Sequence, residues 1–310
     1  MKHKVLIVGY GSSGKRYYKI IKDRYPEIET KVYSYTQRKN NFFIKNKTEL
    51  KLFNPSIVFF CNPSSKRMEF VDLIRETPNI FFEKPIANNI NEAKKILKNF
   101  NNKKLTAVGY NLRLLNILNF VKINLQKFLG NVYSFNCESG YNLKKWRKKD
   151  YTTTVTASRT LGGGAFLELS HELDYINWIF GKKYKAEAYS INTNLLNINV
   201  EDNVKIIFNF SNKILGSLSL DFLNNNKKRF LTINGNKGEL KIDLILNKIY
   251  YLKKNKKIWK NISFIKNDIK NSYYELVDFF LKKNYTKKYE VATIEDGVLV
   301  LKTIEKLKKK

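Results

Sequence analysis

Several residue patterns are scarce or missing in this sequence, and each absence argues against a class of protein. There are 2 cysteines, too few for a disulfide framework or a cysteine metal cluster, so we expect no metal site. No apolar run reaches the roughly 20 residues that a membrane-spanning helix needs. The first apolar run, Val5 to Val8, is shorter than the apolar core of a secretory signal. We therefore predict a cytoplasmic protein without a membrane partner.

Acidic residues are also scarce, because 27 Asp and Glu stand against 58 Lys and Arg, which gives a formal net charge of +31. Such an excess is typical of proteins that bind nucleic acid. The lysines are spread along the chain rather than gathered in one stripe, however, and no nucleic-acid-binding motif is present. We do not expect a nucleic-acid partner, although a basic nucleic-acid-binding protein stays an alternative. A basic field would also favour an anionic substrate or cofactor.

The 310 residues, of which 43% are hydrophobic, suffice for about two domains. In the first part, short apolar runs alternate with helical patterns, which is typical of βαβ units and a parallel sheet. After residue 112, the expected strands alternate apolar and polar residues, as half-buried antiparallel strands do. Strands of the first part are expected at 4–11, 30–36, 55–63, 79–85 and 104–111.

The fold class predicted from this pattern is α/β. A doubly wound parallel sheet is expected in residues 1–112, and an α+β domain with a mostly antiparallel sheet in residues 113–310. The last helix, at about 292–308, could pack back on the first domain. Its sequence begins with Thr293 and Asp296 at the spacing of a capping box.

The first expected strand leads into a glycine-rich stretch, "VLIVGYGSSGKR", in which Gly9, Gly11 and Gly14 have G-x-G-x-x-G spacing. A strand before it and a helix after it are the context in which this spacing predicts a dinucleotide site. The second glycine lets the backbone approach a pyrophosphate, and the helix offers free N–H groups to it. The alternative is a tight turn that binds nothing. The predicted cofactor-binding residues here are Gly9, Tyr10, Gly11, Ser12, Ser13 and Gly14.

The end of the second expected strand bears on the choice of cofactor. An acidic residue there would bind a free ribose 2′-hydroxyl, but "VYSYTQRKN" contains none. It contains Ser34, Thr36 and Arg38 instead, and arginine binds phosphate in a bidentate fork. NADP is therefore favoured over NAD as the cofactor. The alternative is that Arg38 is only a solvated loop residue.

Three segments together carry a family resemblance: "GYGSSGKR", then "FFEKP" (81–85), then "VGYNLR" (108–113). With these motifs, the chain resembles the Gfo/Idh/MocA oxidoreductases over essentially its whole length. The resemblance implies a Rossmann domain, followed by a domain with a large, mostly antiparallel sheet. In that family the large sheet commonly mediates dimers or tetramers, so a homo-oligomer is expected.

The resemblance also implies a role for Lys84, the lysine of the E-K-P motif, beside the nicotinamide and the substrate hydroxyl. A lysine in a confined site can donate to that oxygen and stabilise its developing charge. It implies that Pro85 follows a cis peptide bond. The family often has histidine at the positions of Tyr17 and Arg67, and neither difference is expected to affect the chemistry. Further residues implied on the nicotinamide side are Cys61, Asn62, Pro63, Glu83 and Pro85.

"LGGGAFLELSHELDYINWIFG" (161–181) resembles the second signature of the family, in which a glycine triplet precedes a helix with H-x-x-D. His171 lies off the main apolar stripe of this helix, and its ordinary pKa range suits a proton acceptor for an alcohol. Many family members have an aspartate four residues earlier, where this chain has Leu167. Glu168 is the nearest acid and is the candidate for orienting His171. The alternative is a histidine with a purely structural role.

The polar stretch 139–164 lies where the family has its substrate loop. Trp146 could stack on a sugar, and Arg147 could hold a carboxylate or a phosphate. The alternative is a surface arm that packs on another part of the protein. The predicted substrate-binding residues are Arg113, Trp146, Arg147, Tyr151 and Asp174.

Together these features predict an NAD(P)-dependent dehydrogenase or reductase that acts on a CH–OH group. The expected substrate is a sugar, a nucleotide sugar or a polyol, with an anionic one favoured, and the resemblance points to surface-polysaccharide sugar metabolism. His171 would exchange the hydroxyl proton while Lys84 polarises the same oxygen. The alternative within the same fold is a non-catalytic protein that binds the cofactor or a sugar.

Overall fold

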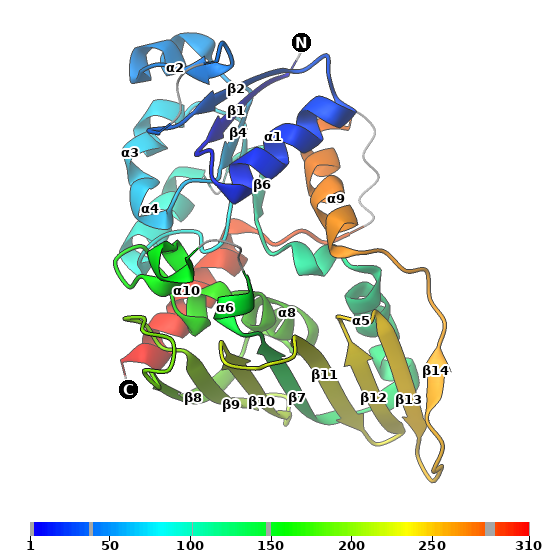
Figure 1. Ribbon diagram of the computed structural model, residues 1–310. Helices are drawn as coiled ribbons and strands as arrows, with labels where there is room; N and C mark the ends of the chain where they lie inside the picture. The colour runs from blue at the N-terminus through cyan, green and yellow to red at the C-terminus, as the bar shows by residue number, and fades with distance from the viewer. Residues whose placement is uncertain (1–2, 37–39, 101, 147–149, 283–288, 310) are drawn as a thin grey trace. The chain divides into compact units, whose positions relative to one another are not determined.

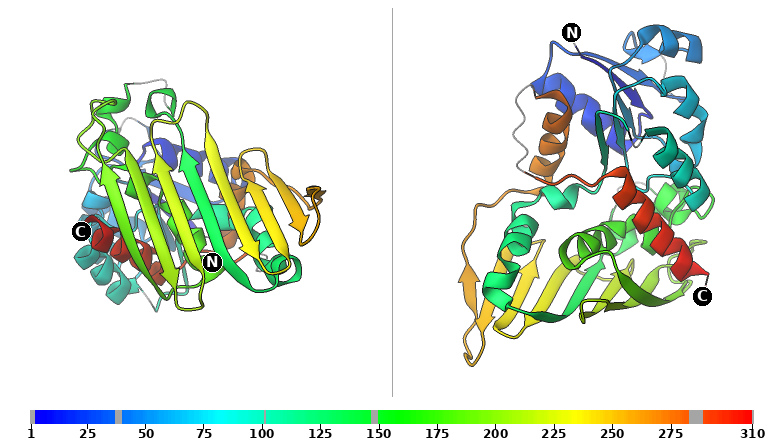
Figure 2. Two further views of the ribbon diagram at one scale, coloured as in Figure 1. Left: turned by 90° about the horizontal axis from the view of Figure 1, so that it is seen from below. Right: turned by 180° about the vertical axis from the view of Figure 1, so that it is seen from behind.

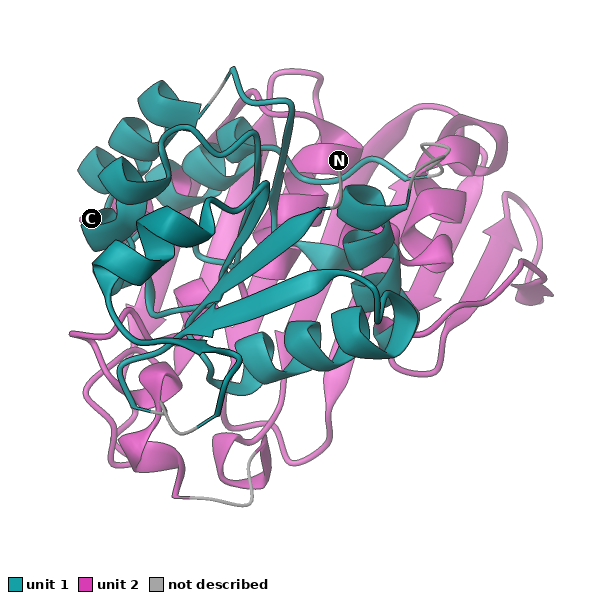
Figure 3. Cartoon of the chain, turned by 90° about the horizontal axis from the view of Figure 1, so that it is seen from above, with its two compact units in different colours: residues 1–111, 270–302 teal, residues 112–269, 303–310 magenta. Residues whose placement is uncertain are grey.

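The computed structural model describes residues 3–36, 40–100, 102–146, 150–282 and 289–309 (Figure 1). The chain forms two compact units (Figure 3). Unit 1 consists of residues 1–111 and 270–302, and unit 2 of residues 112–269 and 303–310. The first break along the chain thus falls next to residue 112, the expected domain boundary. Residues 270–302, in contrast, group with the first unit rather than with the second.

Unit 1 is built on a parallel sheet, whose described strands have the order β3-β2-β1-β4-β5-β6. The order reverses between β1 and β4, which is the switch point of a doubly wound Rossmann sheet. The predicted fold class is therefore confirmed for this unit. The short β3 was not expected from the sequence. The strands are β1 (Lys4–Val8), β2 (Glu29–Tyr33), β3 (Phe43–Ile44), β4 (Ile57–Phe60), β5 (Asn79–Phe82) and β6 (Leu105–Val108).

The central strands of this sheet are buried on both faces, because helices cover both sides (Figure 1). Residues 57–60 of β4 have no exposed surface, which explains their uninterrupted apolar sequence. The helical pattern of residues 64–76 folds as a short α-helix between two 3₁₀ turns, at 64–66 and 72–74. The helices are α1 (Ser12–Arg24), α2 (Lys47–Phe53), α3 (Met68–Val71), α4 (Ile90–Phe100), α9 (Ile269–Leu281) and α10 (Ile294–Lys308).

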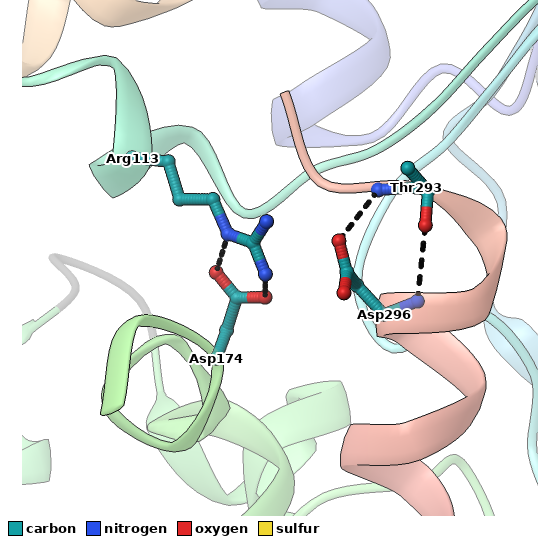
Figure 4. A network of polar contacts seen from close by, with 4 residues as sticks. All are labelled: Arg113, Asp174, Thr293 and Asp296. Carbon is teal, nitrogen blue, oxygen red and sulfur yellow. Dashed lines mark hydrogen bonds and ion pairs between the residues drawn. The ribbon is translucent and has the colours of Figure 1, made fainter. Parts of the chain in front are cut away.

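The C-terminal part of unit 1 is attached to β6. The N–H of Val108 donates to the carbonyl of Ala292 at 2.8 Å, and α10 begins directly afterwards. The expected capping box is confirmed: Thr293 N donates to Asp296 Oδ2 at 3.1 Å, and Asp296 N donates to Thr293 Oγ1 at 3.2 Å (Figure 4). Gly297, one residue further on, leaves room for Val108 and Ile86 to approach the helix backbone.

Unit 2 contains a large sheet with the strand order β14-β13-β12-β11-β7-β10-β9-β8. Among its described strands, β7 and β10 are parallel, and the other neighbours are antiparallel. The prediction of a mostly antiparallel sheet is therefore confirmed. The strands are β7 (Val132–Gly140), β8 (Tyr184–Ile191), β9 (Asn203–Phe210), β10 (Leu215–Asp221), β11 (Lys228–Gly235), β12 (Gly238–Asp243), β13 (Lys248–Lys253) and β14 (Lys260–Ile262).

Strand β9 shows how the sheet divides into two faces, since its residues alternate between buried and exposed. Val204, Ile206 and Phe208 point into the core, where the helices of this unit pack. Among the described residues of this unit, no helix covers the opposite face (Figure 2, left). The helices are α5 (Asn116–Leu129), α6 (Leu143–Trp146), α7 (Ala165–Glu168) and α8 (Ser170–Phe180).

Candidate dinucleotide and substrate sites

The glycine loop after β1 is closed at two of its glycines and open at the third. A Cβ at Gly9 would lie 2.6 Å from Asn62 N, and Gly9 has a φ of +97°. A Cβ at Gly14 would lie 2.0 Å from Gly9 O, so α1 packs directly on the loop. Gly11, in contrast, has nothing within 4 Å of a Cβ position. The open position is the one where the backbone of a dinucleotide-binding loop meets the pyrophosphate.

Helix α1 presents its N-terminus at this open position. Its N-cap is Gly11, no side chain caps the helix, and its first turn holds no acidic residue. The first N–H groups therefore point out with a partial positive charge, which suits a phosphate. Ser12 is exposed and Ser13 half-buried. Tyr10 packs edge-on against Phe43, with ring centroids 5.2 Å apart, and also meets Tyr18 of α1 at 5.9 Å.

The carboxyl ends of the neighbouring strands are in register along one edge of the sheet. Val8 pairs with Tyr33 of β2 and with Phe60 of β4, and Phe60 pairs in turn with Phe82 of β5. The residues that come next are therefore brought to one edge from separate parts of the sequence. They are Gly9 after β1, Ser34 after β2, Cys61 after β4 and Glu83 after β5.

Asn62 supplies a hydrogen-bond acceptor at this edge. Its side chain is buried at 6% exposure, and its Nδ2 donates to Lys66 O at 3.0 Å. Its Oδ1 is buried and accepts no hydrogen bond from any described residue. A buried acceptor without a donor is costly unless a ligand satisfies it. Together with the open Gly11, this atom shows that the residues present fit a nicotinamide dinucleotide.

The E-K-P segment follows β5, and the peptide bond between Lys84 and Pro85 is cis, as the resemblance implied. Glu83 is held on both oxygens: Tyr17 Oη donates to Oε1 at 3.2 Å, and the backbone N–H of Lys84 donates to Oε2 at 3.2 Å. Burial, together with the nearby charge of Glu83, raises the pKa of Tyr17 well above its ordinary value. Lys84 itself is half-buried.

Arg67 connects the E-K-P segment to the loop after β4. At 1% exposure, its guanidinium donates to the carbonyl of Pro85 and, at 3.3 Å, to the carbonyl of Asn62. Burial lowers the pKa of Arg67 to about 10, against the opposing effect of Glu83, so the group stays charged at neutral pH. Tyr17 and Arg67 therefore both contact the segment that carries Lys84, and the expectation that their difference from histidine leaves the chemistry unaffected stays a prediction.

At the end of β2, the predicted phosphate ligands Ser34 and Thr36 differ in their exposure to solvent. Ser34 is buried at 6% exposure, and its Oγ accepts a hydrogen bond from the backbone N–H of Thr36 at 3.4 Å. The two hydroxyl oxygens of Ser34 and Thr36 are also 3.4 Å apart, and Thr36 is exposed. Arg38 lies outside the described residues.

In unit 2, the signature helix is broken into α7 and α8 at Leu169, where the sequence predicts one helix. Before the break, Gly164 has a φ of +103°, and a Cβ there would lie 2.4 Å from Glu201 Oε1. Glu168 and His171 are half-buried on either side of the break. Tyr175, four residues after His171, is fully buried, and its hydroxyl lies 3.0 Å from Cys137 Sγ.

Two buried ion pairs hold the beginning of α8. Arg113 Nε donates to Asp174 Oδ2 at 2.8 Å and Arg113 Nη2 to Oδ1 at 2.7 Å, with each residue 1% exposed (Figure 4). Arg229 Nε lies 2.7 Å from Oε1 of the fully buried Glu172. Burial lowers the pKa of Arg229, but Glu172 and Tyr175 outweigh it, so that the pKa is raised.

This arrangement bears on the substrate contacts predicted for Arg113 and Asp174. The two side chains satisfy each other in a bidentate pair, which is the strong geometry for arginine and carboxylate. Such a pair supports the helix that carries His171. A direct contact of either residue with substrate stays a prediction.

The other predicted substrate residues lie in or near α6. Trp146 is half-buried, and its ring meets that of Phe222 edge-on at 5.4 Å. Tyr151 donates its hydroxyl hydrogen to Leu196 O at 2.9 Å. Arg147 falls outside the part of the chain that the structure describes. Sugar binding by this segment therefore also stays a prediction.

Sequence reasoning missed three residues that support these sites. Glu172 stands directly after His171, and an acid inside an otherwise apolar helix is a local signal of a buried partner. Its partner Arg229 is far away in sequence and gave no signal. Glu69 reaches the end of β2 from α3 and likewise has no motif.

Two absences hold for the described residues. No three of their histidine, cysteine, aspartate or glutamate side chains gather as metal ligands could. No described helix has the length and apolar character needed to cross a bilayer.

The fold closely matches those of several solved oxidoreductases. A levoglucosan dehydrogenase in complex with NADH is 15% identical, with a TM-score of 0.78 over 100% of this chain and 98% of that one. UDP-N-acetylglucosamine 3-dehydrogenase from Acidithiobacillus ferrooxidans is 13% identical, with a TM-score of 0.76 over 99% and 97%. Aldose-aldose oxidoreductase from Caulobacter crescentus, complexed with glycerol, is 17% identical, with a TM-score of 0.77 over 100% and 97%.

Comparison by sequence gives a more limited result. No curated protein matches the chain. Residues 122–241, however, match the GFO/IDH/MocA C-terminal domain. Residues 122–241 thus match this domain, and the whole chain has a fold that solved oxidoreductases share, which agrees with the resemblance to the Gfo/Idh/MocA oxidoreductases.

Proposed function

We propose that the chain is an NAD(P)-dependent oxidoreductase that acts on a CH–OH group of a sugar, a nucleotide sugar or a polyol. The observation that carries the proposal is the alignment of strand ends in unit 1. It brings the open glycine loop, the acceptor of Asn62 and the E-K-P segment to one sheet edge. Ligands of doubly wound sheets bind outside this edge. The named structural neighbours, which are sugar dehydrogenases and oxidoreductases, support the substrate class.

The cofactor would be held by the residues around the glycine loop. Gly11 and the first N–H groups of α1 would bind the pyrophosphate, and Asn62 Oδ1 would accept a hydrogen bond from a ligand N–H or O–H group. When bound, the nicotinamide ring supplies or takes up the hydride. Either NAD or NADP satisfies this part of the proposal.

The proton chemistry is assigned to Lys84 and His171. In the oxidising direction, the alcohol loses a hydride from carbon and a proton from oxygen, and it leaves as a carbonyl compound. His171 accepts that proton, with Glu168 as the residue that orients it. Lys84 donates a hydrogen bond to the same oxygen and stabilises its negative charge. In the reducing direction, His171 returns the proton.

The substrate is assigned to the segment around α6, with Trp146, Arg147 and Tyr151. Of two nearby basic side chains, Arg229 is paired with the buried Glu172, and the exposed Lys227 supports an anionic substrate. Arg229 pairs in register with Ser139 at the end of β7, where the segment begins. Burial lowers the pKa of Lys227, and the charge of Arg229 lowers it further. A sugar with a phosphate or carboxylate group, as in surface-polysaccharide precursors, would suit a segment beside this lysine.

The open face of the large sheet supports the proposed homo-oligomer. Tyr189 and Ile207 are 82% and 52% exposed on this sheet, and exposed apolar side chains on one face are typical of interfaces. Light scattering of the purified protein would show a dimer or tetramer. A monomer at high concentration would contradict this. Action in the cytoplasm remains part of the proposal.

The test of the activity is the reduction of NAD or NADP in the presence of candidate substrates. Levoglucosan, L-sorbose and UDP-N-acetylglucosamine are suitable probes, because structural neighbours are named for the first and third and one binds the second. We expect Lys84→Ala to lose most of the turnover while its cofactor affinity stays near that of the wild type. The exposed Lys94→Ala on α4 is the matched control.

Two outcomes would count against the proposal. Equal turnover in Lys84→Ala and Lys94→Ala would remove Lys84 from the mechanism. Tight cofactor binding without turnover of any sugar, in both directions, would favour the non-catalytic alternative.

A further inference from the structure

The structure places an acidic side chain at the end of β2, where the local sequence has none. Glu69 of α3 accepts a hydrogen bond from the hydroxyl of Tyr35, which follows β2 by two residues. In dinucleotide-binding folds, the acid that binds the ribose 2′-hydroxyl lies about 20 residues after the glycine loop. Tyr35 is at that distance in sequence. Glu69 of α3 therefore lies where the acid of such folds is found, although it comes from a different element.

The packing of α3 holds Glu69 at the end of β2. Phe70, the neighbour of Glu69, is fully buried. Its ring contacts those of Tyr33 and Tyr35, with centroid distances of 5.2 and 6.4 Å. Because Phe70 is anchored under the end of β2, Glu69 has to lie beside Tyr35. Tyr33 O also accepts the N–H of Gly9 at 2.8 Å, so this strand end is tied to the glycine loop.

The carboxylate remains able to bind a ligand. Its side chain is 37% exposed, and Lys66 Nζ lies 3.4 Å from Oε1. Two oxygens offer about four acceptor positions, so Tyr35 and Lys66 leave room for a ribose hydroxyl. The hydrogen bond from Tyr35 lowers the pKa of Glu69, and Lys66 adds to this. Glu69 is therefore negatively charged at any pH near neutral.

Of the groups expected to bind a 2′-phosphate, Arg38 lies outside the described residues, and the Ser34 hydroxyl is less well placed than Glu69. The Ser34 oxygen is buried and engaged with Thr36. Lys66, a cation that a phosphate could attract, is already paired with Glu69. A phosphate at this position would meet the carboxylate of Glu69, and like charges in contact repel each other.

We propose that Glu69, positioned by Tyr35, binds the ribose 2′-hydroxyl of the cofactor and makes the chain selective for NAD(H) over NADP(H). The inference rests on the proposed function, since it assumes a dinucleotide at the glycine loop. It reverses the preference for NADP that was drawn from the sequence after β2 alone. Glu69 replaces the missing acid through tertiary contacts.

The experiment is a fluorescence titration of the whole protein with NADH and with NADPH. We expect the wild type to bind NADH at least about tenfold more tightly, the size of one charged hydrogen bond. Glu69→Gln should remove most of that ratio, by weakening NADH and strengthening NADPH binding. Tyr35→Phe should shift the ratio in the same direction but less. The exposed acid Glu76 supplies the control, because Glu76→Gln removes the same charge elsewhere in unit 1.

The outcomes separate this inference from the proposed function. Saturable binding with NADPH preferred would overturn the inference and leave the dehydrogenase standing. The same holds if Glu69→Gln keeps the wild-type ratio, or if Glu76→Gln changes it equally. No saturable binding of either cofactor would overturn the proposed function, and the inference with it.

Discussion

At the scale of single residues, Arg67 and Tyr17 show how a half-buried lysine can be held still. They approach the E-K-P segment through Pro85 and Glu83, the two neighbours of Lys84. Neither is assigned a contact with substrate, so both are positioning residues. Histidine at these places would titrate near neutral pH, whereas arginine and tyrosine do not.

We expect Arg67→Met to reduce kcat by roughly 100-fold, because a small displacement of a catalytic group can cost that much. The dissociation constant of the cofactor should change far less than kcat. Steady-state kinetics and cofactor titration measure the two quantities. Arg75→Met is the control, since Arg75 is 57% exposed and paired with an exposed aspartate. A similar loss in both variants would contradict a positioning role for Arg67.

The pH dependence of Arg67→His provides a second test. Arg67 has a pKa of about 10, so it stays charged in the wild type up to that pH. Burial of a histidine would lower its pKa below its ordinary value of about 6.5. The variant should therefore lose kcat as the pH rises through about 6, with a limb that the wild-type profile lacks. Parallel profiles would show that the charge at this position is not needed.

At the scale of elements, two glycines of the glycine loop have different roles, one in cofactor binding and one in packing. Gly11 has an extended conformation with φ −76° and open space around it, whereas Gly14 touches the backbone of Gly9. A methyl group should therefore have opposite consequences at the two positions.

For Gly11→Ala, we expect stability within about 0.5 kcal/mol of the wild type and a loss of NADH affinity of more than tenfold, because the methyl group takes the place of the pyrophosphate. For Gly14→Ala, we expect a loss of stability of about 1–3 kcal/mol from overpacking. Urea unfolding and NADH titration distinguish the two effects. Unchanged NADH binding in a stable Gly11→Ala protein would argue against a cofactor at this loop.

Helix α8 is a second element whose position depends on charges. Removing one partner of a buried ion pair leaves an uncompensated charge, which costs about 3–5 kcal/mol. We expect Arg113→Met to destabilise unit 2 by about this amount in urea unfolding. The double variant Arg113→Met with Asp174→Leu should recover much of the loss, because no charge remains unpaired. If the double variant loses as much as the sum of its single variants, the two side chains do not stabilise each other.

Prediction from sequence succeeded where the signal was local. The glycine spacing, the change of hydrophobic period after residue 112 and the capping box at Thr293 are all contained in short windows, and the structure has the corresponding elements. The break at Leu169 and the partners of Glu172 and Glu83 depend on residues far away in sequence. The preference for NADP, drawn from the absence of an acid after β2, stays a prediction; the proposal for Glu69 opposes it with a residue that arrives there through the packing of Phe70.

At the scale of the whole molecule, the chain combines a Rossmann unit with a GFO/IDH/MocA C-terminal domain. The first carries Lys84 and the second carries His171, and the proposed reaction needs both. This division of labour is the central claim, since each unit alone would hold only half of the acid–base chemistry.

The most direct test is the turnover of Lys84→Ala, His171→Ala and the double variant with the best substrate from the sugar panel. Groups that act together on one oxygen show strongly non-additive losses. We predict that each single variant loses most of the turnover. The turnover of the double variant should be only slightly lower than that of the less active single variant. Losses that multiply, or a His171→Ala variant as active as the wild type, would contradict the account.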